Sequence, residues 1–162
     1  MRRAGTARRI GQRLRRDLGD RGLGGFGGVG SILELNVALA DRKAGRGASY
    51  RGLHDSLVNY LGNRDPQMMV CLHEEHAVGI AQGYGKITGK PMAVALHSNV
   101  GLMHGTMAIF NAWCDRVPML LLGATGPVDA KARRPWIDWI HTSRDQAAMI
   151  RQYVKFDDQP GS

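Results

Sequence analysis

The sequence predicts an α/β fold, a doubly wound and mostly parallel sheet with helices on both faces, in three layers. The first observation is a set of short, nearly continuous apolar segments of strand length, residues 67–72, 91–97 and 117–123. The second is that segments with apolar residues at helical spacing separate them. The third is that these strand segments are apolar almost throughout, which is typical of a parallel sheet covered on both faces.

The first third of the chain has a different composition. Residues 1–51 hold 12 Lys/Arg against 4 Asp/Glu, which accounts for the whole net charge of +8, and 11 of the 22 glycines. We interpret residues 1–45 as a basic Gly/Arg-rich segment that is disordered or not native, as after a shifted reading frame, and residues 46–162 as the domain. A basic arm for nucleic acid and a transit-type presequence are the alternatives.

Helices and strands can be assigned along the rest of the chain. Residues 31–40 fit either a short helix or a strand. Residues 54–61 predict a helix with Leu53, Leu57, Val58 and Leu61 on one face, which Gly62 and Asn63 end. Asp65 and Pro66 turn the chain into the strand at 67–72, and a helix from Glu74 to Thr88 comes next, closed by Gly89.

The second half repeats this alternation. The strand at 91–97 leads into a helix from Leu102 to Trp113, and the strand at 117–123 ends in a Gly-rich turn. We expect a turn of helix at 136–141 and a longer helix from 143 to 154. Gly83 lies inside the first long helix, where glycine costs about 1 kcal/mol relative to alanine, so we expect another element to approach closely there.

Polar residues gather where two predicted strands end. Glu74 and Glu75 stand at a strand-to-helix junction, and His97 and Ser98 end the next strand. Open α/β sheets bind ligands at such carboxyl ends. Spacing alone leaves open that Glu74 is an exposed carboxylate that complements the helix dipole, and that His97 bonds only to backbone.

The histidines beside the two glutamates invite a metal hypothesis. His73 and His76 are three residues apart with both acids between them, whereas the H-E-x-x-H zinc motif places its histidines at i and i+4. We therefore predict no metal ligands in this chain.

The run His73-Glu74-x-x-Ala77-Val78, followed by GYGKITGKP at 83–91, resembles the N-terminal pyrimidine-binding domain of the thiamine-diphosphate-dependent enzymes, in the group of acetolactate synthase, benzoylformate decarboxylase and benzaldehyde lyase. The likeness covers residues 47–160. It implies binding of thiamine diphosphate and action on 2-keto acids by decarboxylation and carboligation.

The resemblance also implies roles for residues. Glu74 would be the catalytic, cofactor-binding carboxyl group that hydrogen-bonds the aminopyrimidine ring and favours its imino tautomer. Gly47 and Ala48 would lie against the pyrimidine. His97 and Ser98 would face the substrate, where a histidine can move protons.

The chain also departs from the family pattern. Arg46 stands where a loop proline is usual, so we expect the first strand of the sheet to be missing or aberrant. The Gly-Asp-Gly motif of a separate domain that fixes the diphosphate and Mg²⁺ is absent from the sequence. The resemblance therefore predicts a truncated chain that needs a diphosphate-binding domain, is inactive alone, and leaves open whether FAD is bound in the full-length protein.

The same reasoning extends to partners and location. The resemblance implies a homodimer or homotetramer formed through the helices of this domain; a non-catalytic dimerisation module and, less favoured, a nucleic-acid-binding module are the alternatives. Cys71 and Cys114 lie far apart in apolar sequence, which predicts two buried free thiols and a cytoplasmic protein. The apolar segments are too short to span a membrane.

Overall fold

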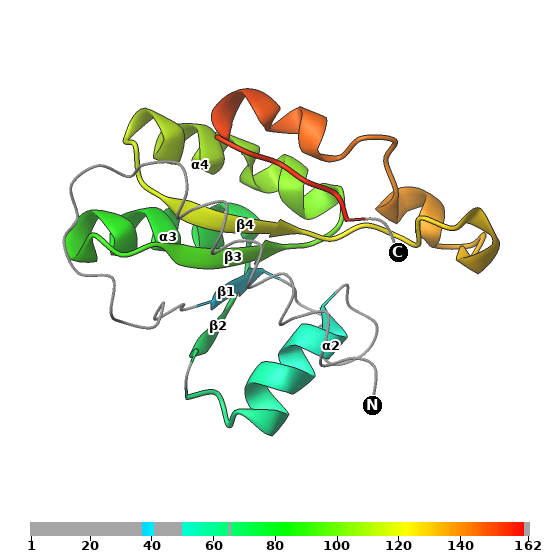
Figure 1. Cartoon of the computed structure of the whole chain (residues 1–162), viewed down its shortest axis with the longest axis horizontal. Helices are drawn as coiled ribbons and strands as arrows, with labels where there is room; N and C mark the ends of the chain where they lie inside the picture. The colour runs from blue at the N-terminus through cyan, green and yellow to red at the C-terminus, as the bar shows by residue number, and fades with distance from the viewer. Residues whose placement is uncertain (1–36, 41–49, 65, 161–162) are drawn as a thin grey trace. The chain divides into compact units, whose positions relative to one another are not determined.

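The computed structural model describes residues 37–40, 50–64 and 66–160 (Figure 1). The chain divides into two units, Met1–Leu33 and Glu34–Ser162, and the first lies wholly outside the described residues. The predictions for residues 1–45, including the boundary at 45/46, therefore fall on residues that the structure does not describe, apart from the strand at 37–40. Every described helix and strand belongs to the second unit.

Four parallel strands form the sheet, in the order β2-β1-β3-β4. They are β1 (Val37–Ala40), β2 (Met68–Cys71), β3 (Met92–Leu96) and β4 (Met119–Gly123). The α/β fold with a parallel sheet is thus confirmed, and the three predicted strands are found within two residues of their expected ends. Residues 37–40, which fitted helix or strand, form β1 in the interior of the sheet, so a strand does precede Gly47.

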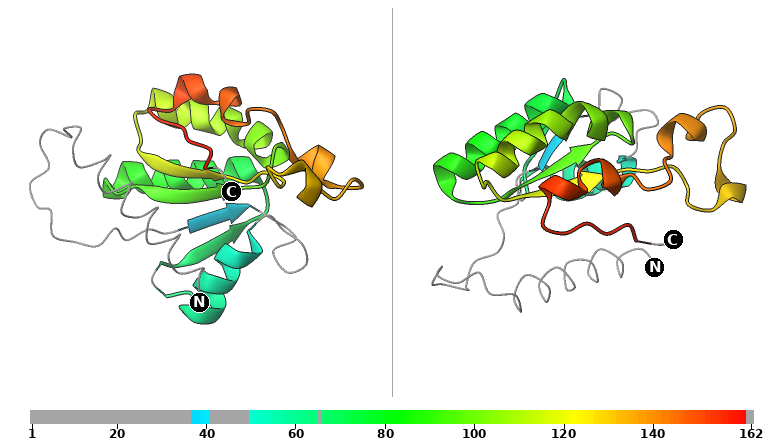
Figure 2. Two further views of the ribbon diagram at one scale, coloured as in Figure 1. Left: turned by 45° about the vertical axis from the view of Figure 1, so that its right-hand side comes forward. Right: turned by 90° about the horizontal axis from the view of Figure 1, so that it is seen from above.

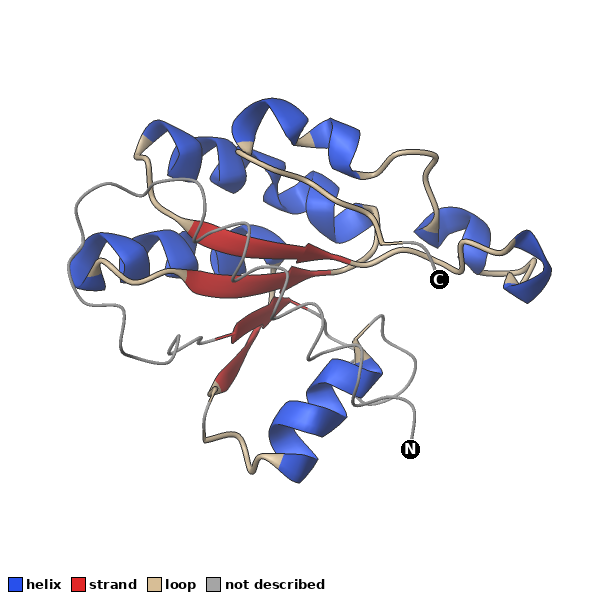
Figure 3. Cartoon of the chain, in the orientation of Figure 1, coloured by secondary structure: helices blue, strands red, loops and turns tan. Residues whose placement is uncertain are grey.

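Helices cover both faces of this sheet, which confirms the three layers (Figures 2 and 3). On one face lie α3 (Glu74–Thr88) and α4 (Val100–Cys114). On the other lie α2 (Arg51–His54) and η1 (Asp55–Tyr60), a short π-helical continuation of it. Leu57 of η1 is buried as predicted, whereas Leu61 is 40% exposed.

Strand β3 separates the two apolar clusters, because side chains along a strand alternate between faces. Met92, Val94 and Leu96 join the cluster under α3 and α4, and Ala93 and Ala95 join the one under η1. The first cluster also contains buried residues of β2, α3, α4 and the C-terminal segment: Cys71, Ala77, Val78, Ala81, Leu102, Ala108, Ile109 and Ile150. The second adds only Leu57 and Met68 among buried residues of the described chain.

The predicted limits of α3 are those observed, for local reasons. His73 is the N-cap residue, and its ring accepts a hydrogen bond from the Glu75 N–H. Gly89 ends the helix in the left-handed conformation, with φ of 71°, which glycine adopts without a steric penalty. An added Cβ at Gly83 would have nothing within 4 Å in this chain, so a close approach there stays a prediction for the contact between two copies. Within the chain the close approach is at Gly85, where an added Cβ would lie 2.5 Å from Val117 Cγ1.

The C-terminal segment differs from the prediction. Short 3₁₀ turns take the place of the helix expected from 143 to 154: η4 (Ala147–Met149) and η5 (Arg151–Tyr153). The turn of helix expected at 136–141 is present as η3 (Asp138–His141), and a further turn, η2, covers Ala130–Ala132.

The two cysteines also differ from each other. Cys71 is buried, and burial raises the pKa of its thiol, whereas Cys114 is exposed, contrary to the prediction. Among the described helices, none has the length and apolar character needed to cross a membrane.

Candidate functional site

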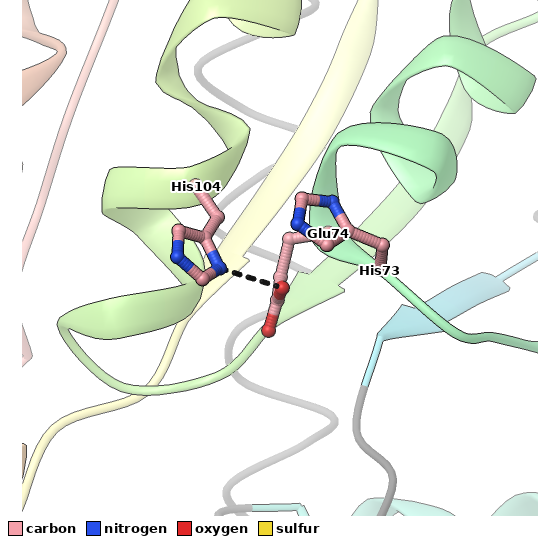
Figure 4. A group of neighbouring side chains, drawn as sticks. All are labelled: His73, Glu74 and His104. Carbon is pink, nitrogen blue, oxygen red and sulfur yellow. Dashed lines mark hydrogen bonds and ion pairs between the residues drawn. The ribbon is translucent and has the colours of Figure 1, made fainter.

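Glu74 lies at the first position of α3, directly after the turn at the end of β2 (Figure 4). Its side chain is only 15% exposed although it stands at a helix terminus. The first turn of α4 provides this shelter, because Gly101 has no Cβ. A Cβ there would lie 3.1 Å from Glu74 Cγ and Oε1 and 2.9 Å from His97 Cβ. The carboxylate therefore packs against backbone rather than extending into solvent.

His104, one turn further along α4, is the polar partner that faces this carboxylate. Its Nδ1 lies 3.4 Å from Glu74 Oε2, as Figure 4 shows. The distance exceeds the usual 2.7–3.2 Å range of N–H···O bonds, so the contact is a weak one. A stronger ring-nitrogen donor can replace it at this oxygen.

His73 stacks on His104, with ring centroids 5.0 Å apart and planes 13° from parallel. The ligand atoms of His73, Glu74 and His104 lie within 4.8 Å of one another, the spacing of a potential metal site. However, Nδ1 of His73 accepts the Glu75 N–H, so in the neutral ring Nε2 carries the hydrogen and has no lone pair for a metal. As long as the helix cap holds, this cluster offers a metal ion one imidazole and one carboxylate.

The second pair of predicted site residues lies after β3. His97 is half-buried, and its Nε2 lies 3.2 Å from Nε2 of His141, a residue of η3. Ser98 is 2% exposed, so its hydroxyl lies inside the domain in this conformation. Both therefore stand where the chain leaves the sheet, with only His97 partly open to solvent.

Asn99 links this turn to the segment that carries His141. Its backbone has a positive φ of 49°, and its Nδ2 donates to the Ile140 carbonyl at 3.3 Å. Its Oδ1 is buried and has no hydrogen-bond partner among the described residues.

The structure thus brings two predicted residues to one place, since Glu74 and His97 both reach Gly101. Gly47 and Ala48 lie outside the described residues, and their role stays a prediction. Gly101, His104 and His141 were not found from the sequence. The predicted helix began at Leu102, whereas α4 begins at Val100 and so includes Gly101. The signal for His104 was its place in the first turn of the predicted helix, which follows the strand end at His97 and Ser98.

A family model and two relatives of known name were compared with this chain. The family model "Thiamine pyrophosphate enzyme, N-terminal TPP binding domain" matches residues 49–149. Acetolactate synthase of Bacillus subtilis (strain 168) is 26% identical over 102 residues, which is 63% of this chain and 17% of that protein. Benzoylformate decarboxylase of Pseudomonas aeruginosa is 35% identical over 57 residues, which is 35% of this chain and 11% of that protein.

The solved structures show the same fold. The crystal structure of benzoylformate decarboxylase from Polynucleobacter necessarius superposes with a TM-score of 0.63 at 18% identity, over 79% of this chain and 22% of that one. The chain spans less than a quarter of the length of each of these three proteins. With the family model matching well over half of its residues, the chain belongs to the thiamine pyrophosphate enzymes and contains their N-terminal TPP binding domain.

Proposed function

We propose that this chain provides the pyrimidine-binding half of a thiamine diphosphate site in an enzyme that acts on 2-keto acids. The observation that supports it is the sheltered carboxylate of Glu74, 15% exposed and packed against Gly101. A partly desolvated carboxyl group can exchange a hydrogen bond and a proton with a nitrogen heterocycle. The weak contact with His104 leaves Glu74 Oε2 available for this exchange.

In this proposal the cofactor's thiazolium ring supplies the electron sink for chemistry at the keto carbon. The chain's own residues bind and orient. Glu74 would hold the pyrimidine, Gly47 and Ala48 would contact it, and His97 and Ser98 would lie on the substrate side. In this proposal a separate domain would hold the diphosphate with Mg²⁺, and the binding of FAD by the full-length protein stays open.

The test of Glu74 uses the neighbouring acid as a control. Glu75 occupies the next position of α3 and is exposed. We expect thiamine diphosphate added to the ¹⁵N-labelled chain to shift the amide signals around Glu74 and Gly101. Glu74→Gln should abolish these shifts and Glu75→Gln should leave them unchanged. Equal responses of the two variants, or no response of the unmodified chain, would contradict the proposal.

Because the proposal assigns only the pyrimidine-binding half of the cofactor site to this chain, we expect no turnover of pyruvate or benzoylformate by the purified chain with thiamine diphosphate and Mg²⁺. Product formation above the level of the Glu74→Gln variant would show that the missing half is dispensable.

We also propose that two copies pair through α3 and α4. Several large apolar side chains on these helices are exposed: Ile80, Ile87, Val100, Met103 and Met107. Val100, Met103 and Met107 are three and four residues apart and so share one side of α4, and exposed apolar surface is typical of interaction sites. Sedimentation velocity should give a dimer or tetramer, and Met103→Lys with Met107→Lys should shift it toward monomer. A monomeric unmodified chain would contradict this pairing.

A further inference from the structure

His73, Glu74 and His104 form a cluster of potential metal ligands at the N-terminal end of α3 (Figure 4). Their ligand atoms all lie within 4.8 Å of one another. His73 and Glu74 are neighbours at the start of α3, whereas His104 reaches them from α4, 30 positions after Glu74. The cluster is therefore built by the packing of two helices, which the local spacing of His73 and His76 does not reveal.

The donor set and one of its distances suit zinc. Two imidazoles and one carboxylate are the ligands of many catalytic zinc sites, in which a water molecule completes a tetrahedron. With bonds of about 2.0–2.1 Å, the ligand atoms of such a tetrahedron lie about 3.3–3.4 Å apart. Nδ1 of His104 and Oε2 of Glu74 are 3.4 Å apart, so this pair already has the required separation. The ligand atom of His73 lies within 4.8 Å of the other two and completes the set after a small adjustment.

Solvent reaches the cluster through His104. The side chain of His104 is 53% exposed, whereas that of Glu74 is 15% exposed and packs against Gly101. A metal ion can therefore enter past His104 and meet the sheltered carboxylate. The positive end of the α3 dipole disfavours a cation at this place, but Glu74 and Glu75 put two carboxylates into the same turn and offset it.

His73 has a second role, which a metal ion interrupts. Its Nδ1 accepts the Glu75 N–H at 3.2 Å and so caps α3. A metal ion on Nδ1 takes the lone pair of this bond. A metal ion on Nε2 leaves the ring hydrogen on Nδ1, where it faces the Glu75 N–H. Whichever nitrogen binds, the metal bond replaces the cap bond.

We propose that His73, Glu74 and His104 bind a zinc ion, which displaces the His73 cap and blocks the contact between Glu74 and the pyrimidine. The metal site is independent of the proposed function, and only the competition with the cofactor rests on it. Imidazole ligands suit zinc, whereas Mg²⁺ prefers carboxylate and water oxygens. The site therefore discriminates against the Mg²⁺ that accompanies the diphosphate.

Titration of the ¹⁵N-labelled chain with Zn²⁺ tests the site directly. We expect one strong site per chain in isothermal titration calorimetry, together with shifts of the ring signals of His73 and His104. The Glu75 amide signal should shift as well, because this N–H loses its acceptor. Mg²⁺ at the same concentration should produce none of these changes. The absence of Zn²⁺ binding, or binding that leaves the His104 ring and the Glu75 amide unchanged, would overturn the inference.

Three variants distinguish this cluster from the local histidine pair. His73→Asn removes the imidazole but keeps a strong N-cap residue, so α3 stays capped. His73→Asn and His104→Gln should each weaken Zn²⁺ binding at least about tenfold, since even changes outside the ligand shell typically cost about 10- to 100-fold. His76→Gln is the matched control, because this exposed ring has its centroid 5.5 Å from that of His73, and it should leave the affinity unchanged. Unchanged affinity in His104→Gln, or an equal loss in His76→Gln, would overturn the inference.

The competition is tested with thiamine, because the diphosphate of the complete cofactor itself binds metal ions. Saturating Zn²⁺ should suppress the thiamine-induced shifts around Glu74 and Gly101, and the same Zn²⁺ concentration should not suppress them in His104→Gln. Shifts that persist in the zinc-loaded wild type would overturn the competition. If Zn²⁺ binds as expected but neither thiamine nor thiamine diphosphate produces a response at Glu74, the proposed function fails and the metal site stands. If the cofactor response is present and Zn²⁺ does not bind, only the metal site falls.

Discussion

The two faces of the sheet are built differently. On the face covered by α3 and α4, β3 presents Met92, Val94 and Leu96, all at most 2% exposed. On the face covered by α2 and η1, the same strand presents Ala93 and Ala95. Among the described residues, the first face, here called the dense face, therefore buries the large side chains of β3. The second, here called the thin face, buries only Leu57 and Met68 beside these alanines, with partly buried side chains packed against them: Tyr50, Leu53, Val58, Leu120 and Leu122.

The candidate site belongs to the densely packed face. Glu74, Gly101 and His104 all lie on α3 and α4, and these helices pack closely at Gly105. A Cβ at Gly105 would lie 3.3 Å from Leu96 Cδ1 and 3.5 Å from Val78 Cγ2. Because interiors of this density transmit small displacements, the position of Glu74 depends on the core behind it. The thin face, in contrast, can lose contacts without moving the carboxylate.

The largest expected effect on stability comes from truncating a buried side chain on the dense face. Leu96 is fully buried, and Leu96→Ala should lower the free energy of unfolding by about 2–5 kcal/mol, measured by urea denaturation. Leu57→Ala, on the thin face, is the matched change and should lie near the lower end of that range, at about 2 kcal/mol. An equal or larger loss for Leu57→Ala would contradict the contrast between the faces.

A substitution at Gly101 tests how tightly the dense face packs next to the candidate site. Gly101→Ala inserts a methyl group 2.9 Å from His97 Cβ and 3.1 Å from Glu74, and should cost about 1–3 kcal/mol of stability. It should also shift the ring signals of His104. Gly79, on α3, has nothing within 4 Å of its added Cβ, so Gly79→Ala should stabilise by up to about 1 kcal/mol. Equal changes in stability for Gly101→Ala and Gly79→Ala would show that α4 does not pack tightly on Glu74.

Tyr50 tests the thin face by its polar contacts. Its hydroxyl lies within hydrogen-bond distance of the Leu96 carbonyl, at 3.0 Å, and of the Leu122 carbonyl, and its one hydrogen is donated to or shared between them, so it links β3 to β4 from that side. Tyr50→Phe should cost about 1 kcal/mol in urea denaturation, the net value of a typical hydrogen bond. Tyr60→Phe, at a side chain 86% exposed, should have no effect. A loss of stability in Tyr50→Phe well above 1 kcal/mol would mean that polar contacts, and not only packing over alanines, stabilise the thin face.

The layered fold was predictable because its signals are local. Strand runs, helical spacing and the caps of α3 depend on residues within a few positions, and their limits were found almost to the residue. The site was only half predictable. Glu74 and His97 stand at strand ends, but His104 and His141 reach them from 30 and 44 positions away. No local pattern encodes such contacts.

The errors have the same physical origin. Gly83 and Gly85 look alike in the sequence, and only the neighbouring Val117 makes Gly85 the close contact. In place of the helix expected at 143–154, Arg151 binds Asp145 and Asp157, six positions to either side. Six residues is not a helical spacing, so these ion pairs favour an open turn over continued helix.

The smallest expected effect concerns the far end of α3 and α4, where the dense face meets solvent. Asp115 accepts hydrogen bonds from Lys86 at 2.9 Å and Gln82 at 2.6 Å, and these lower the pKa of its carboxyl group. A lowered folded-state pKa means that the stabilisation is present above the unfolded pKa of about 3.9 and is lost as the pH falls through the folded value.

The stability difference between the wild type and Asp115→Asn should therefore be constant from pH 5 to 7 and shrink below about pH 4. Because the pair is exposed, added salt should reduce the difference at every pH. A difference that does not shrink at all as the pH falls below the unfolded pKa would indicate that Asp115 joins the two helices through packing rather than charge.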